Sequence, residues 1–206
     1  MRNRGSIDAM AIAVILLATA FGVLSIWHLP PKQDTSVYRD LGRNMAREAV
    51  GLLSSGGRLV VIARDTTTYK QPAMQISLDA FKQEAEKSKA TVDLRLVELD
   101  PLRPVEVPPG DFYETIRRAK TNDVIVSFLG PPVLEPEQEA KLKAKPRIIA
   151  LCTGSMAAQA NLPGLVRGGL LHAAIVNKSV PASKNATPPQ LAFDQLYAVL
   201  RGAEIK

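Results

Sequence analysis

The chain has 206 residues, of which 46% are hydrophobic and 22% charged, and its formal net charge at pH 7 is +6. This length and composition suit one folded domain of ordinary size. Cys152 is the single cysteine, which excludes a disulfide framework and cysteine-based zinc sites. The two histidines, His28 and His172, are far apart, and Lys and Arg do not cluster with aromatic residues. We therefore predict no metal, no cofactor and no nucleic-acid partner.

The first element is an apolar segment, Ala9–Trp27, which has no charged residue and follows Arg2 and Arg4. A helix of about 20 apolar residues crosses a hydrocarbon core of about 30 Å. We therefore predict an uncleaved membrane anchor whose partner is the lipid bilayer. A short tail before a long domain favours a cytoplasmic N-terminus and a periplasmic domain at a bacterial inner membrane. A cleaved signal ending near Ala18-Thr19-Ala20 and a buried soluble helix are the alternatives.

The rest of the chain indicates one domain with flanking segments. The predicted parts are a tail at 1–8, an anchor at 9–29, a juxtamembrane linker and helix at 30–57, an α/β domain at 58–176, a linker at 177–188 and a C-terminal helix at 189–206. In the juxtamembrane part, helical spacing of apolar residues predicts a helix over Tyr38–Ser54, which Gly42 and Gly51 weaken.

Five strands are expected between residues 58 and 176. Continuous apolar runs predict buried strands at Arg58–Ala63, Val124–Leu129, Arg147–Leu151 and Leu170–Val176. The segment Val92–Leu99 alternates apolar and polar residues, which is typical of an edge strand.

Helical patterns separate these strands. Pro72 lies in the first turn of one helix, Asp111 and Glu114 resemble a capping box, and Pro136 opens a helix that ends in lysines up to Lys145. A short helix is expected over Ser155–Ala160. Strand–helix alternation predicts an α/β fold in which helices cover both faces of a five-stranded parallel sheet. The edge strand fits the flavodoxin-like order 2-1-3-4-5, a three-layer sandwich.

Ligands in such sheets lie beyond the carboxyl ends of the strands, near the switch point between the first and third. The candidate ligand-binding residues there are Arg64, Asp65, Thr66, Thr67 and Tyr69 after the first strand and Thr153, Gly154 and Ser155 after the fourth. Gly130 and Pro131 follow the third strand. Free N–H groups where Thr153-Gly154-Ser155 opens a helix could hold an anion. The alternative is that these residues are ordinary caps and loops.

One family shows the same order of features. The strand Arg58–Ala63, a Thr-rich loop, a helix ending at Glu84-Ala85-Glu86-Lys87 and then Thr91-Val92-Asp93-Leu94 resemble the start of a type I periplasmic binding protein lobe. Ile116-Arg117-Arg118-Ala119 before Asp123-Val124-Ile125-Val126 is similar to the third unit of that family. The resemblance implies a periplasmic-binding-protein-like fold and capture of a solute. Members of the family clasp the ligand between two lobes, whereas only one lobe fits this chain.

No motif here indicates catalysis. The first strand is not followed by G-x-G-x-x-G, and Thr153-Gly154-Ser155-Met156 does not complete a hydrolase elbow. We expect Cys152 and His172 to be packed core residues. The main hypothesis is a noncatalytic assembly or scaffold component of an envelope complex, with protein partners. The alternative is a tethered module that binds a solute or small anion and depends on Arg64.

Overall fold

A computed structural model of the chain describes residues 14–21, 35–68, 70–99, 106–142, 145–153, 160–178, 192–202 and 204–205. The chain divides into two compact units, Met1–Asp34 and Thr35–Lys206. In the first unit, residues 14–21 form a helix, and its large apolar side chains are all more than 60% exposed. This helix is the described part of the predicted anchor. No helix among the described residues has the length and hydropathy of a membrane span.

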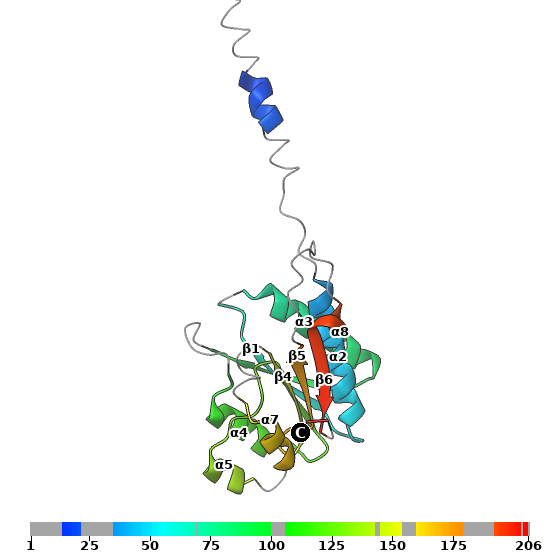
Figure 1. Cartoon of the computed structure of the whole chain (residues 1–206), viewed down its shortest axis with the longest axis vertical. Helices are drawn as coiled ribbons and strands as arrows, with labels where there is room; N and C mark the ends of the chain where they lie inside the picture. Colours follow the sequence, from blue (N-terminus) through cyan, green and yellow to red (C-terminus); the bar gives the residue numbers. More distant parts are fainter. Residues whose placement is uncertain are drawn as a thin grey trace, which may run out of the picture. The chain divides into compact units, whose positions relative to one another are not determined.

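The second unit is built on a six-stranded sheet with the strand order β2-β1-β3-β4-β5-β6 (Figure 1). The strands are β1 (Leu59–Arg64), β2 (Val92–Val97), β3 (Val124–Ser127), β4 (Arg147–Cys152), β5 (Ala173–Asn177) and β6 (Tyr197–Arg201). The first five are parallel, and β6 is antiparallel to β5. The predicted order of these five strands and the edge position of β2 are confirmed.

The predicted C-terminal helix over 189–206 is wrong. Among its described residues, only Phe193–Leu196 are helical (α8), and Tyr197–Arg201 form β6. The apolar spacing around Phe193 and Tyr197 suits one face of a helix, but it also suits a strand. The free edge of β5 decides between them, because Val199 pairs with Ile175 across the sheet and both contact the same hydrophobic core.

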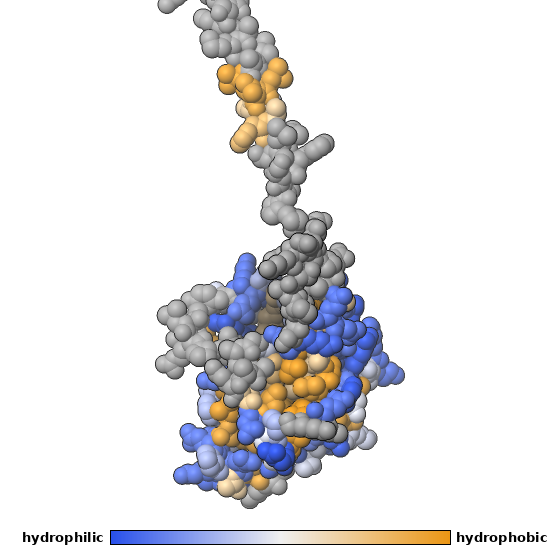
Figure 2. Space-filling model, viewed as in Figure 1, coloured by the Kyte–Doolittle hydropathy of each residue, from blue (hydrophilic) through white to orange (hydrophobic). Residues whose placement is uncertain are grey.

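Helices cover both faces of the sheet, as a three-layer fold requires. They are α2 (Ser36–Leu52), α3 (Pro72–Lys87), α4 (Pro109–Arg118), α5 (Pro136–Ala140) and α7 (Leu162–Arg167). Side chains from α2 and α3 join one core cluster, whereas those from α4 and α7 pack on the opposite face. At the β5–β6 end of that second face, Val176, Ala198 and Leu200 stay half-buried. Figure 2 shows hydrophobic surface over this end.

Two predicted helix boundaries are corrected. Helix α4 begins at Pro109, so Asp111 lies in its first turn and is not its N-cap. A proline is well suited to this position because its missing N–H would have no partner there. Helix α5 ends at Ala140 and does not extend to Lys145, because its five residues bury no apolar face. The predicted helix over Ser155–Ala160 and the linker after residue 178 lie outside the described residues, apart from Ala160.

Gly42 allows α2 to pack closely on α3. A Cβ atom at Gly42 would lie 1.9 Å from the backbone oxygen of Ser77 in α3. Met45 and Phe81 are fully buried beside this contact, and the Phe81 ring meets Phe128 edge-on at 5.8 Å. Gly42 therefore has a packing role that its low helix propensity did not reveal.

Asp123 joins the amino ends of three strands. One carboxylate oxygen accepts a hydrogen bond from the Arg58 backbone N–H at 3.1 Å, and the other accepts from the Lys120 N–H at 2.9 Å. The Arg58 guanidinium lies 3.4 Å from Asp123 and 3.1 Å from Asp93 in β2. Burial alone would raise the pKa of Asp123, but these donors outweigh burial and lower it.

Candidate functional site

The end of β1 carries Arg64, which is only 6% exposed. Its guanidinium donates a hydrogen bond to the backbone oxygen of Leu99 at 3.2 Å, in the segment that follows β2. A buried guanidinium needs such an acceptor, because an unpaired buried charge is costly. Arg64 therefore has a structural partner within the chain and links the ends of β1 and β2.

A short turn follows Arg64. The Asp65 carboxylate accepts a hydrogen bond from the Thr67 N–H at 2.9 Å, and this bond lowers the pKa of Asp65. The Asp65 N–H donates to the Val97 oxygen, which ties the turn to β2. Thr66 is half-buried, whereas Thr67 and Thr68 are exposed. The turn therefore presents hydroxyl groups beside the switch point of the sheet.

The ends of β3 and β4 contribute a different surface. Gly130 has a φ of +103°, a value that favours glycine, and it leads into the buried Pro131 and Pro132. A pocket of about 460 Å³ begins at these prolines and extends between α5 and α7 as far as Leu170, which precedes β5; its lining is mainly apolar, with Asn161 and Glu139 among the residues. Thr153 is half-buried at the end of β4. Tyr69, Gly154 and Ser155 of the predicted site lie outside the described residues.

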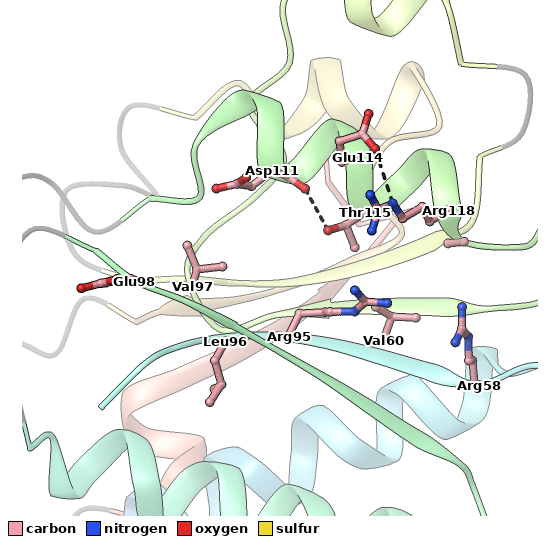
Figure 3. A pocket seen from close by; sticks show the side chains of 11 residues that line it. Arg58, Val60, Arg95, Leu96, Val97, Glu98, Asp111, Glu114, Thr115 and Arg118 are labelled. Carbon is pink, nitrogen blue, oxygen red and sulfur yellow. Dashed lines mark hydrogen bonds and ion pairs between the residues drawn. The ribbon is translucent and has the colours of Figure 1, made fainter. Parts of the chain in front are cut away.

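A second hollow, the β2–α4 groove, has a volume of about 470 Å³ and lies between the edge strand and α4 (Figure 3). Figure 3 shows Glu98 and Asp111 at one end and Arg58 and Arg118 at the other. The arginines are already paired: Arg58 with Asp93 and Asp123, Arg95 with Asp93, and Arg118 with Glu114. Their charges are thus largely neutralised within the chain. No pattern in the sequence predicted this groove; the one related signal is Asp123, directly before the apolar run of β3, which pairs with the lining residue Arg58.

Cys152 is a packed core residue, as predicted, whereas His172 is only half-buried and lies just before β5. Cys152 is fully buried, and burial raises the pKa of its thiol to about 12, so the nucleophilic thiolate is disfavoured. His172 accepts a hydrogen bond at Nδ1 from the Ile148 N–H at 3.2 Å. Burial and the nearby Arg147 lower the pKa of His172, which keeps the imidazole neutral and able to accept this bond.

No protein-family model matches the chain, and no curated protein matches it. Solved structures do. The chain is similar to a periplasmic ribose ABC transporter protein of Conexibacter woesei, with a TM-score of 0.54, 14% identity and coverage of 82% of this chain and 58% of that chain. It is also similar to the sugar-binding protein of a sugar ABC transporter from Bacillus halodurans, with a TM-score of 0.52, 13% identity and coverage of 82% and 63%.

At these identities the likeness shows the fold alone. The chain spans about three-fifths of the length of each of these two proteins. The resemblance to a type I periplasmic binding protein lobe, predicted from the pattern of strands and helices, is confirmed.

Proposed function

We propose that this chain is a noncatalytic binding module that recognises a small, neutral, polyhydroxylated ligand at the carboxyl ends of its parallel strands. One observation carries the proposal. At the switch point of a sheet whose fold resembles a binding-protein lobe, the Asp65 turn holds the exposed Thr67 and Thr68 next to β2. Sheets of this kind bind ligands at this position.

The chemistry of the described strand ends favours a neutral ligand over an anion. Arg64, the cation at the end of β1, is buried against the Leu99 oxygen, and the Asp65 carboxylate is occupied by the Thr67 N–H. The Thr68 hydroxyl can donate to and accept from sugar hydroxyls, and the Thr67 hydroxyl, which also bonds to Asp65, can accept from them. The apolar pocket after β3 suits the C–H face of a sugar ring. Sugars, the class named for the two similar structures, are therefore the first ligands to test.

A single lobe implies modest affinity. A ligand held by two lobes with a Kd of about 1 μM has a binding free energy of about −8 kcal/mol, and half of that corresponds to a Kd of about 1 mM. We therefore expect binding to this chain alone in the millimolar range, strengthened where a second lobe closes over the ligand.

The apolar segment Ala9–Trp27 would tether this module to a membrane, with the domain on the periplasmic side. Support comes from the helix at 14–21, where Leu17 is 71% and Phe21 74% exposed. Side chains this apolar and this exposed favour lipid over water. Resistance of the full chain to alkaline extraction from native membranes tests the anchor. The scaffold hypothesis stays a prediction, because no described contact favours it.

The ligand proposal is tested by adding ribose and other neutral monosaccharides, up to tens of millimolar, to the full chain in mild detergent. Saturation-transfer NMR detects binding this weak, with inorganic phosphate and sulfate as the anionic comparison. Thr67→Val removes a hydroxyl from the turn and should weaken sugar binding. Thr115→Val, which removes an exposed hydroxyl on α4 that donates to the Asp111 oxygen, should not. Binding of phosphate but not of sugars would restore the anion hypothesis, and binding of neither would reject the proposal.

A further inference from the structure

The sheet of the described residues ends at β2, whose outer edge faces no other strand. The Leu59 N–H donates to the Thr91 oxygen and the Asp65 N–H to the Val97 oxygen, so the backbone groups of these odd-numbered residues point toward β1. Backbone groups alternate in direction along a strand, so those of Val92, Leu94 and Leu96 point outward. Such an edge is a template for another strand.

The side chains of β2 also alternate, between the two faces of the sheet. Val92 and Leu94 pack against the core on the α3 side, and Leu96, 49% exposed, belongs to the same alternating set. In Figure 3, Leu96 and Arg95 point to opposite sides of the strand. Arg95 lies 3.1 Å from Asp93 on the α4 side, and its side chain is 43% exposed. The edge therefore has one apolar face and one face with a charge of each sign.

We propose that a second copy of this chain docks on this edge by pairing β2 with β2 in antiparallel fashion about Leu94. In a symmetric antiparallel pair of two β2 strands, the outward-pointing backbone groups of the two copies face each other only when the two-fold axis passes through a residue. An axis between two residues would place an outward-pointing residue opposite one that points toward β1. A centre at Asp93 places Asp93 opposite itself, and a centre at Arg95 places Arg95 opposite itself. The centre at Leu94 instead places each Asp93 opposite an Arg95.

The Leu94 register also satisfies the other requirements. Leu94 meets Leu94, and each Leu96 meets Val92, so the exposed leucine gains an apolar neighbour on the same face. All three of these pairs are of the hydrogen-bonded kind, because their backbone groups point outward. A self-complementary patch of this sort is what a two-fold dimer uses, which favours a second copy over an unrelated partner. The inference does not rest on the proposed ligand.

Charge reversal tests the pairing by native mass spectrometry of the full chain released from detergent micelles. We expect a dimer at tens of micromolar. Arg95→Asp places an aspartate opposite Asp93 twice in each dimer and should raise the dimer Kd about tenfold or more. The double variant Asp93→Arg with Arg95→Asp should restore the dimer, since the exchanged charges again face each other. Arg118→Asp, the same change on α4, should leave the dimer unaltered.

Disulfide trapping tests the register and does not require Asp93, which also binds Arg58, to be replaced. The native Cys152 is buried. In the proposed register Val92 and Leu96 of different copies have Cα atoms about 5.5 Å apart, within disulfide range. A mixture of Val92→Cys and Leu96→Cys chains should form a mixed disulfide. Neither variant alone should form a disulfide, because in a dimer of one variant the introduced cysteines of the two copies lie about 13 Å apart.

Several results would overturn the inference. These are a monomer at tens of micromolar, a dimer that Arg95→Asp leaves intact, a disulfide within either variant alone together with no mixed disulfide in the mixture, and a different protein bound at the edge in place of the second copy.

Discussion

The contact between Gly42 and Ser77 predicts opposite effects for one substitution at two positions of α2. In Gly42→Ala the new methyl group would lie 1.9 Å from a backbone oxygen, so α2 and α3 must move apart where Met45 and Phe81 pack. Overpacking of this severity costs about 3 kcal/mol, and the better helix propensity of alanine offsets up to about 1 kcal/mol of it. The free energy of unfolding should therefore fall by about 2 kcal/mol.

Gly51→Ala is the matched control, because Gly51 is exposed in the same helix and a Cβ there meets no atom within 4 Å. It should stabilise the chain by about 0.5–1 kcal/mol. Thermal unfolding of the full chain in detergent, followed by circular dichroism, measures both. For a domain of this size 1 kcal/mol corresponds to about 2–4 °C, so Gly42→Ala should lower the Tm by about 4–8 °C and Gly51→Ala should raise it slightly. Equal shifts for both variants would refute the close packing of α2 on α3.

Three further predictions concern charge and burial. Asp123→Ala leaves two backbone N–H groups without their acceptor, whereas Arg58 keeps its pair with Asp93, and urea unfolding should show a loss of about 2–4 kcal/mol, with Asp123→Asn losing less. Hydrogen bonds from Lys87 and Arg47 lower the pKa of Glu84 from 4.5 to about 2. The ionised Glu84 therefore stabilises the fold fully above pH 4.5, and this stabilisation is lost as the pH falls toward 2. In an acid unfolding profile, Glu84→Gln should not show this loss of stability between pH 4.5 and 2. The Cys152 thiol, with a pKa of about 12, should resist maleimide at pH 8 until the chain unfolds, and fast labelling of the folded chain would contradict its burial.

Strands are predicted best from the sequence where their pattern of apolar residues is regular. Continuous apolar runs identified β1, β3 and β4, and alternation of apolar and polar residues identified β2 as the edge strand. Prediction failed at Tyr197–Arg201, where the free edge of β5 overrides a helix-like spacing, and at Gly42, where the reason for glycine lies in another helix. Both failures depend on contacts between residues distant in the sequence.

The candidate site was predictable only in position. Topology places Asp65 and Thr67 at the switch point, but the partner of Arg64 is a backbone oxygen 35 residues away, which no pattern in the sequence reveals. The roles of Tyr69, Gly154 and Ser155 and of the anchor Ala9–Trp27 stay predictions.

The most direct test of the proposed ligand site is a ribose titration of the full chain in detergent, followed through the amide NMR signals of the labelled protein. Shifts that saturate in the millimolar range are expected for the amides of residues 65–68 in the turn and for those of Leu129, Gly130, Val133 and Leu134 after β3, between which Pro131 and Pro132 have no amide proton. Shifts confined to residues 95–98 and 111–118 along the β2–α4 groove, or no shifts up to tens of millimolar ribose and other neutral sugars, would contradict the proposed site.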